Sequence, residues 1–122
     1  MSEPGSQTEI PVIGRDKLLR RVGGDLRLLR ELVDIFLGAL PEHLQRLREA
    51  LAEEDIESLY KGAHYLKGSA GLFAAGPAVE AASQLDDLAR SGVYDGLKAA
   101  VDVLEQELGR LEPALREILE AS

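Results

Sequence analysis

Apolar residues recur along most of this chain at spacings of three and four, the pattern of helices that bury one face. The two longest stripes lie before the middle of the chain and close to its end, and we expect each to form one long helix. The first stripe comprises Leu29, Leu32 or Val33, Phe36, Leu40, Leu44, Leu47 and Leu51. The last comprises Leu97, Val101, Leu104, Leu108, Leu111, Leu115 and Ile118.

Two shorter stripes between them predict two further helices. We expect the third helix to run to a stop at Gly76, and the fourth to begin at Pro77, because glycine commonly ends a helix and proline suits its first turn. The third stripe comprises Ile56, Leu59, Ala63, Leu66, Ala70 and Phe73, and the fourth Val79, Ala82, Leu85 and Leu88 or Ala89.

Polar residues mark where these helices begin. Asp25 and Asp55 each stand immediately before a stripe, which predicts that their carboxylates cap the following helix. A short helix is predicted over residues 15–22, stopped by Gly23 and Gly24.

Proline interrupts both long stripes without ending them. Pro41 lies inside the first long stripe and Pro113 inside the last. Since the apolar spacing continues on both sides of each proline, we expect local irregularities, with a kink at Pro41, rather than separate helices.

Short connections between successive stripes favour neighbouring antiparallel helices. The predicted fold is all-α, an antiparallel (up-down) four-helix bundle with an additional short N-terminal helix. The last stripe taken alone is also compatible with a coiled coil. The polar residues 1–11 predict a disordered tail, and residues 12–120 one domain.

Composition narrows the possible functions of the 122 residues. The formal charge of -8 argues against a nucleic-acid binder, which needs a basic face. The absence of cysteine excludes disulfides and thiolate metal sites. No stretch has the length and apolarity of a membrane span or the pattern of a signal peptide, so we expect a soluble, cytoplasmic protein without membrane partners.

The solvent-facing side of the third predicted helix carries the most distinctive residues. At about 100° per residue, His64 lies off the apolar stripe, with Gly68 one turn further along and Lys67 close by. Tyr60 and Lys61 border the same surface. A lone histidine on such a face is usually an ordinary surface residue.

Glycine within a helix lowers its stability, so several glycines in one helix suggest a purpose other than helix formation. Gly62, Gly68 and Gly71 all lie in the third predicted helix, where each costs about 1 kcal/mol relative to alanine. Gly68 leaves the backbone bare beside His64, so that another protein can approach the imidazole. Gly62 points nearer to the core, where tight helix packing is the better explanation.

The segment Ala63-His64-Tyr65-Leu66-Lys67-Gly68-Ser69-Ala70-Gly71 resembles the signature of histidine-containing phosphotransfer (HPt) domains, which carry phosphate between receiver domains of two-component relays. The resemblance extends over roughly residues 12–120. It implies a phosphocarrier without a self-contained active site, which accepts phosphate on His64 from a receiver phospho-aspartate. Lys67 would offset charge and Gly68 would admit the partner. Docking residues would include Tyr60, Lys61, Gly71, Leu72 and Leu37.

The resemblance also implies the cofactors and partners. The chain would need no cofactor of its own, and Mg²⁺ would belong to the receiver domain. Its partners would be response regulators or a hybrid sensor kinase. Apart from the resemblance, we expect a monomer, because a self-sufficient bundle need not dimerise. A neutral imidazole is a competent nucleophile near neutral pH, because the ordinary pKa of histidine is about 6.5.

Two positions depart from the pattern of relatives. Asp86 stands where some of them carry a polar side chain that reaches the imidazole from the next helix. A carboxylate there could orient the ring, but it would also repel a phosphoryl group. Ala74 replaces a frequent glycine, which we expect to be harmless within a helix.

Two alternative functions remain possible, and two other kinds of site are excluded. The domain could be a pseudo-HPt adaptor that only binds proteins, or the phosphoacceptor domain of a larger chemotaxis-type or hybrid kinase. A nucleotide-binding P-loop fails because Lys67 precedes Gly68 and no strand comes before them. A di-metal bundle fails because no glutamate lies three residues before His43 or His64. We expect His43 to be a plain surface histidine.

Overall fold

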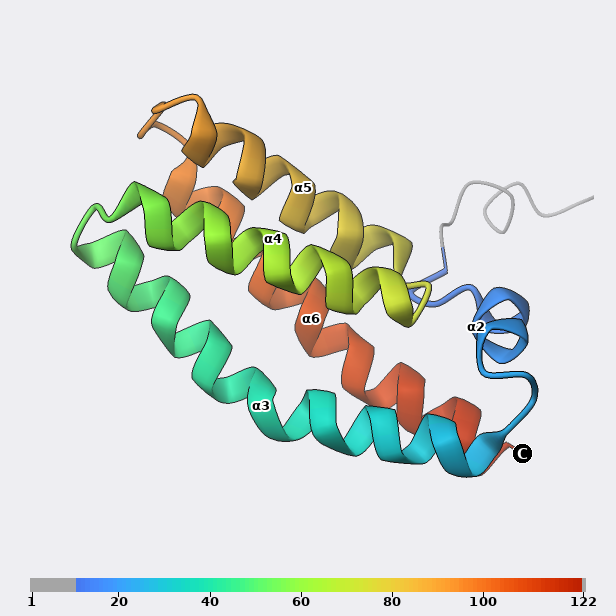
Figure 1. Cartoon of the computed structure of the whole chain (residues 1–122). Coiled ribbons are helices and arrows are strands. Elements are labelled where there is room, and N and C mark those ends of the chain that lie inside the picture. Colours follow the sequence, from blue (N-terminus) through green and yellow to red (C-terminus); the bar gives the residue numbers. More distant parts are fainter. Residues whose placement is uncertain (1–10, 122) are drawn as a thin grey trace, which may run out of the picture.

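The structure, a computed structural model, describes residues 11–121 and contains five helices and no strand within that range (Figure 1). This confirms the all-α prediction. The predicted disordered tail lies outside the described residues, except for Pro11. The helices are α2 (Arg15–Arg21), α3 (Leu26–Ala52), α4 (Ile56–Leu72), α5 (Gly76–Arg90) and α6 (Leu97–Glu120).

The four longer helices form a closed ring of contacts. Helix α3 packs on α4, α4 on α5, α5 on α6, and α6 again on α3. The chain reverses direction at each turn between them, and α2 lies across the end where α3 begins (Figure 1). Each helix can therefore turn its apolar stripe toward a common core.

The core is built from the stripes that the sequence predicts. All seven stripe positions of α6 are buried, and so are Leu29, Val33, Phe36, Leu40 and Leu47 of α3. Between the alternatives Leu32 and Val33, the valine is 1% exposed and the leucine is only partly buried. Phe36 and Phe73 pack with ring centroids 5.2 Å apart, which joins α3 to the end of α4.

The predicted helix caps are confirmed. The backbone N–H of Leu28 donates to the Asp25 carboxylate at 3.1 Å, and that of Ser58 donates to Asp55 at 3.1 Å. Each carboxylate thereby satisfies a backbone donor that the first helical turn leaves without a partner. The hydroxyl and backbone N–H of Ser58 both hydrogen-bond to Asp55 and hold its pKa below the usual value.

The end of α4 differs from the prediction. The helix ends at Leu72, not at Gly76, and Ala74 adopts a left-handed φ of 55°. The backbone N–H of Ala74 donates to Gly71 and that of Ala75 to Ala70, which is the hydrogen-bond pattern of a Schellman turn. Ala74 is thus not a helical residue. The expectation that Ala74 lies within a helix is wrong, and a Cβ atom disfavours the left-handed conformation that it adopts instead.

Both internal prolines lie within continuous helices, as predicted. Pro41 lies inside the 27 residues of α3, and Pro113 inside the 24 residues of α6. Figure 1 shows α3 bending part-way along its length. The bend keeps both halves of the helix against the core.

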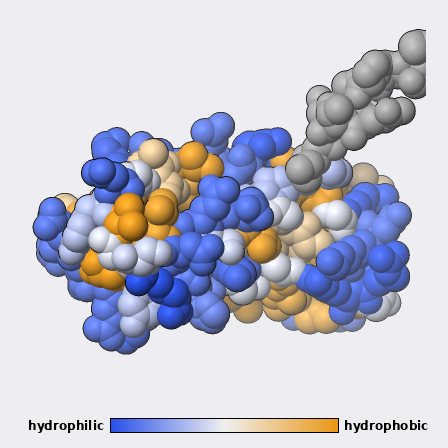
Figure 2. Space-filling model, turned by 90° about the horizontal axis from the view of Figure 1, so that it is seen from above, coloured by the Kyte–Doolittle hydropathy of each residue, from blue (hydrophilic) through white to orange (hydrophobic). Residues whose placement is uncertain are grey.

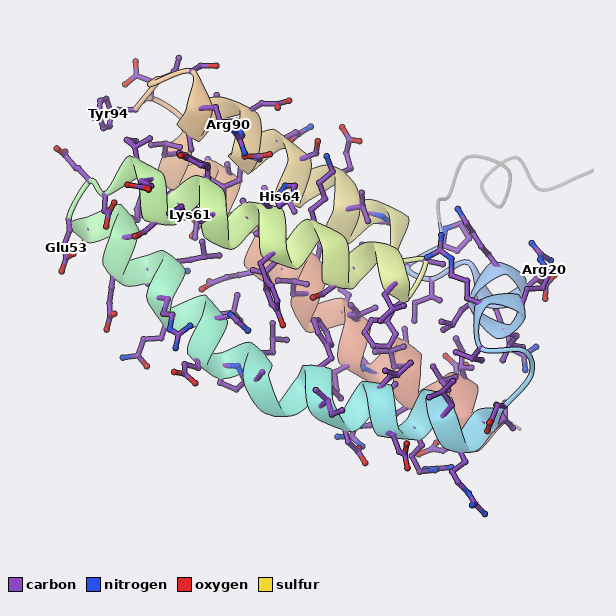
Figure 3. The ribbon with its side chains drawn as sticks, viewed as in Figure 1. Arg20, Glu53, Lys61, His64, Arg90 and Tyr94 are labelled. Carbon is purple, nitrogen blue, oxygen red and sulfur yellow. The ribbon has the colours of Figure 1, made fainter. Side chains whose placement is uncertain are left out.

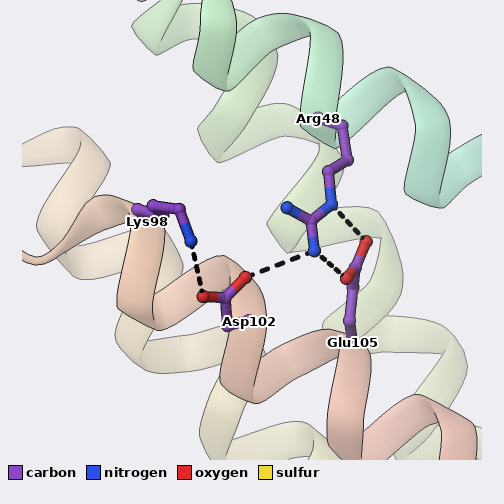
Figure 4. A network of polar contacts seen from close by, with 4 residues as sticks. All are labelled: Arg48, Lys98, Asp102 and Glu105. Carbon is purple, nitrogen blue, oxygen red and sulfur yellow. Dashed lines mark hydrogen bonds and ion pairs between the residues drawn. The ribbon is translucent and has the colours of Figure 1, made fainter.

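A polar network also links α3 to α6 (Figure 4). Arg48 donates to Glu105 through Nε, at 2.8 Å, and through Nη2, and it reaches Asp102 at 3.2 Å. Lys98 lies 3.1 Å from the other oxygen of Asp102. The hydrogen bond from Lys98, and more weakly the charge of Arg48, lower the pKa of Asp102.

Candidate functional site

His64 projects from α4 to solvent. Ala63 and Leu66 on the same helix are 0% and 1% exposed, so the opposite face of this segment lies fully in the core. The His64 side chain is exposed and lies on the side of α4 that faces α5 (Figure 3). The imidazole is therefore accessible to a reacting group from another protein.

The three glycines of α4 have different surroundings. A Cβ atom added at Gly68 would meet nothing within 4 Å, whereas one at Gly62 would lie 3.0 Å from Leu47 Cδ2. The predicted roles of bare backbone at Gly68 and tight packing at Gly62 agree with these distances. Gly71 is half-buried near Val79, and its carbonyl accepts a hydrogen bond from Arg21 of α2.

The two lysines near His64 are not equivalent. Lys61 forms an ion pair with Glu57 at 2.8 Å, and the hydrogen bond in that pair raises the pKa of the lysine. Lys67 is half-buried and forms no ion pair or hydrogen bond within residues 11–121. Of the two ammonium groups, that of Lys67 is thus the one without a competing carboxylate.

Asp86 does not contact His64 through a hydrogen bond. Its carboxylate instead accepts one from Arg90 Nε, at 2.7 Å, one turn further along α5. The Arg90 guanidinium lies over the Tyr60 ring, 4.4 Å from its centroid. The sequence prediction gave Asp86 two opposing roles at the imidazole, and the structure gives it a different partner.

The model of the Hpt domain matches residues 31–114, well over half of the chain. The chain belongs to the Hpt domain family. Membership confirms the resemblance drawn from the signature around His64 and implies a phosphotransfer role in two-component signalling. Neither a curated protein nor a solved structure gives a significant match.

The described part of this Hpt domain offers neither a membrane-spanning helix nor a cluster of metal ligands. No helix among the described residues has the length and apolarity required to cross a membrane. Within residues 11–121, no three side chains of His, Cys, Asp or Glu come together in a way that could hold a metal ion.

Sequence reasoning missed Arg90. The available signal was its spacing from Asp86, since an acid and a base four residues apart face each other on a helix. The contact of Arg90 with Tyr60 could not be predicted from the sequence, because it joins α5 to α4. The register between these two helices is set only when the domain is packed. Figure 3 shows Arg90 reaching from α5 on the same side of the molecule as His64.

Three large apolar side chains of α3 and α4 are exposed. Leu72 is 43% exposed and Tyr65 52%, while Ile35 on α3 is 70% exposed and was not among the predicted docking residues. Seen from above, the molecule carries small separate apolar patches among hydrophilic side chains (Figure 2). His43 is half-buried and packs on Tyr65, with ring centroids 4.4 Å apart, so it is not the plain surface histidine expected.

Proposed function

We propose that this Hpt domain is a phosphorelay intermediate, which accepts a phosphoryl group on His64 from a receiver-domain phospho-aspartate and passes it to another response regulator. The observation that carries the proposal is the exposed His64 imidazole with open space above Gly68, one turn away. Together with the family match, this arrangement suits a carrier that must be reached by a second protein's active site.

The chemistry requires little from the carrier itself. The lone pair of one ring nitrogen forms the N–P bond while the P–O bond of the acyl phosphate breaks, and the aspartate carboxylate leaves. The other ring nitrogen keeps its proton. Such transfers depend on in-line geometry and charge neutralisation. We place the Mg²⁺ that neutralises the transferring group on the receiver and none on this chain.

Lys67 and Gly68 support the transfer in different ways. Lys67 lies three residues after His64 and pairs with no carboxylate of residues 11–121, so its ammonium group is available to offset the charge of the phosphoryl group. Gly68 lets the receiver backbone approach the ring. The exposed side chains of Tyr65 and Leu72 on α4 and of Ile35 on α3 provide apolar area for docking, and we assign Tyr60, Lys61 and Gly71 to the same docking surface.

The proposal also covers the helix topology, the extent of the domain and its oligomeric state. We infer that α3 to α6 form an up-down antiparallel four-helix bundle and that residues 12–120 are one domain, acting in the cytoplasm as a monomer. The closed ring of helix contacts supports the bundle. Light scattering coupled to size exclusion tests the monomer, since a stable dimer would double the measured mass.

The decisive experiment measures phosphoryl transfer from a phosphorylated receiver domain to His64. Purified receiver domains are charged with acetyl phosphate and Mg²⁺, mixed with the full chain, and the chain is examined by intact mass and ³¹P NMR. We expect acid-labile, alkali-stable phosphate on the wild type and none on His64→Gln. His43→Gln is the matched control, because His43 and His64 are the two histidines of the chain. The proposal fails if no receiver phosphorylates the wild type, or if His64→Gln gains as much phosphate.

A further inference from the structure

Charge is distributed unevenly along the chain. Residues 11–30 carry six basic and two acidic side chains, a net charge of +4, whereas residues 31–122 carry eight basic and eighteen acidic ones, a net charge of -10. The six basic residues of the first group are all exposed, and we call them the basic end: Arg15, Lys17, Arg20, Arg21, Arg27 and Arg30. The overall charge of -8 therefore conceals a positive surface.

The basic end lacks the carboxylate partners that the rest of the domain provides. Beyond residue 30, seven of the eight Lys and Arg side chains form an ion pair, and Lys67 is the exception. No cation of the basic end pairs with a carboxylate of residues 11–121. Arg21 donates to the backbone carbonyl of Gly71, and the other five make no side-chain hydrogen bond within the same residues. Their charge is thus available to a partner.

The basic end occupies one end of the bundle. Helix α2 lies across the end where α3 begins, and Arg20 projects from it away from the four longer helices (Figure 3). Glu53, at the turn between α3 and α4, lies at the opposite end (Figure 3). The 27 residues of α3 span about 40 Å, several times the screening length of about 10 Å in physiological salt. Acids at the far end therefore hardly repel an anionic surface that approaches the basic end.

The composition of the basic end suits a lipid surface better than a protein partner. Leu28 lies between Arg27 and Arg30 and is 40% exposed. Residues 11–30 contain no aromatic side chain, the type that most often anchors a protein interface. Clusters of about four to eight Lys or Arg residues bind anionic headgroups through the sum of many weak attractions, which require no fixed geometry. This mode of binding fits cations that no carboxylate holds in place.

We propose that the basic end binds the headgroups of anionic phospholipids at a membrane surface, with Leu28 at the boundary between headgroups and acyl chains. The sequence-based expectation of no membrane partner rested on the absence of a spanning segment, and a peripheral contact needs none. Attachment through one end of the bundle leaves the side that carries His64 accessible (Figure 3). The inference goes beyond the proposed function and does not depend on it.

Sedimentation of the full chain with lipid vesicles tests the proposal. The vesicles contain phosphatidylglycerol and phosphatidylcholine in equal parts, or phosphatidylcholine alone. We expect binding to the anionic vesicles only, and a steep loss of binding when the ionic strength rises from about 0.05 to about 0.5 M, because added ions screen the attraction. Equal binding to both kinds of vesicle, or no binding to the anionic ones, would overturn the proposal.

Two triple variants distinguish the basic end from net charge. Lys17→Gln/Arg20→Gln/Arg27→Gln should bind the anionic vesicles about a hundredfold more weakly, since each cation near such a surface contributes about fivefold. These three side chains make no hydrogen bond or ion pair within residues 11–121, so their loss should leave the fold intact, which circular dichroism checks.

The matched control removes one lysine and two arginines elsewhere. Arg46→Gln/Lys98→Gln/Arg110→Gln changes the net charge by the same amount on surfaces outside the basic end, and its binding should change by less than about threefold. Equal losses in the two triple variants would refute a localised site. His64→Gln should bind like the wild type, so failure of the relay and failure of membrane binding are separate results.

Fluorescence tests which end meets the membrane. The chain contains no tryptophan, so an introduced one reports only its own surroundings. The emission of Leu28→Trp should shift to shorter wavelength on anionic vesicles, whereas that of Val93→Trp should not. Val93 is 42% exposed and precedes Tyr94, which lies at the end opposite Arg20 (Figure 3). Equal shifts at both positions, or none, would overturn the proposed orientation. Retention on immobilised polyglutamate without binding to vesicles would assign the basic end to an acidic protein instead.

Discussion

Gly62 of α4 lies against Leu47 of α3 so closely that a Cβ atom at position 62 would be 3.0 Å from Leu47 Cδ2. Leu47 is 1% exposed, so it has little room to move. The same added atom at Gly68, less than two turns along the helix, would meet nothing. Gly62 therefore allows close helix packing, whereas Gly68 leaves open space at the surface. Substitution of each by alanine should have different effects on stability and on phosphate transfer.

Gly68→Ala is expected to make the protein more stable and less active. Alanine in a helix interior gains about 0.5–1 kcal/mol over glycine, and the open surroundings of Gly68 impose no steric cost. The new methyl group would obstruct the receiver, and we expect phosphate transfer to slow about tenfold or more. Thermal melting and the transfer rate measure the two effects.

Gly62→Ala is the control for that experiment. Its methyl group would press on Leu47, so its free energy of unfolding should be at least about 1 kcal/mol lower than that of Gly68→Ala. A Gly68→Ala protein that transfers phosphate as fast as the wild type would contradict the role given to Gly68.

Ala74→Gly is expected to stabilise the fold. Alanine in the left-handed region costs about 1–2 kcal/mol, and glycine there loses about 0.5–1 kcal/mol of chain entropy. The net gain should be about 0.5–1 kcal/mol, measured by chemical denaturation. Glu54→Gly, at the second non-glycine residue with φ of 55°, should shift stability in the same direction. Loss of stability in both variants would refute the strain argument.

Asp55 makes the stability of the Hpt domain depend on pH. Hydrogen bonds from Ser58 lower the pKa of Asp55 in the folded protein, so its contribution is fully present above the unfolded value of about 3.9. The contribution disappears as the pH falls through the lower folded pKa. Asp55→Ala should accordingly melt below the wild type at pH 7, and the difference should narrow in acid.

Asp55→Asn tests the cause of that effect. Asparagine caps helices about as well as aspartate but carries no charge. Its melting temperature should therefore stay close to that of the wild type at neutral pH. A gap between Asp55→Ala and wild type that is constant from pH 7 to pH 2 would contradict the assignment.

Leu104 tests the register of the core. Leu104→Ala removes a side chain with 0% exposure from the centre of α6, and about 2–5 kcal/mol of stability should be lost. The neighbouring Val103 is 44% exposed, so Val103→Ala should cost about 0.5 kcal/mol or less. Urea unfolding compares the two, and similar losses would show that the stripe is wrongly assigned.

Much of the helical architecture follows from local rules. Spacings of three and four identify the buried stripe of α6 because one helix turn brings those residues together whatever surrounds them. The caps at Asp25 and Asp55 are equally local, since each carboxylate bonds to a backbone N–H three residues away. The end of α4 escaped prediction because Ala74 has no residue type that signals a left-handed turn.

Some features of the site likewise follow from local spacing, and others depend on how the helices pack. Helical spacing alone places His64 toward solvent with Lys67 and Gly68 alongside, since the geometry of one helix fixes which side chains share a face. The pairing of Asp86 with Arg90, four residues later on α5, follows the same helical spacing, whereas the position of Arg90 over Tyr60 became visible only in the folded protein. A contact between α4 and α5 depends on the register and distance between the two helices, because packing of the whole core establishes both and no local spacing encodes them.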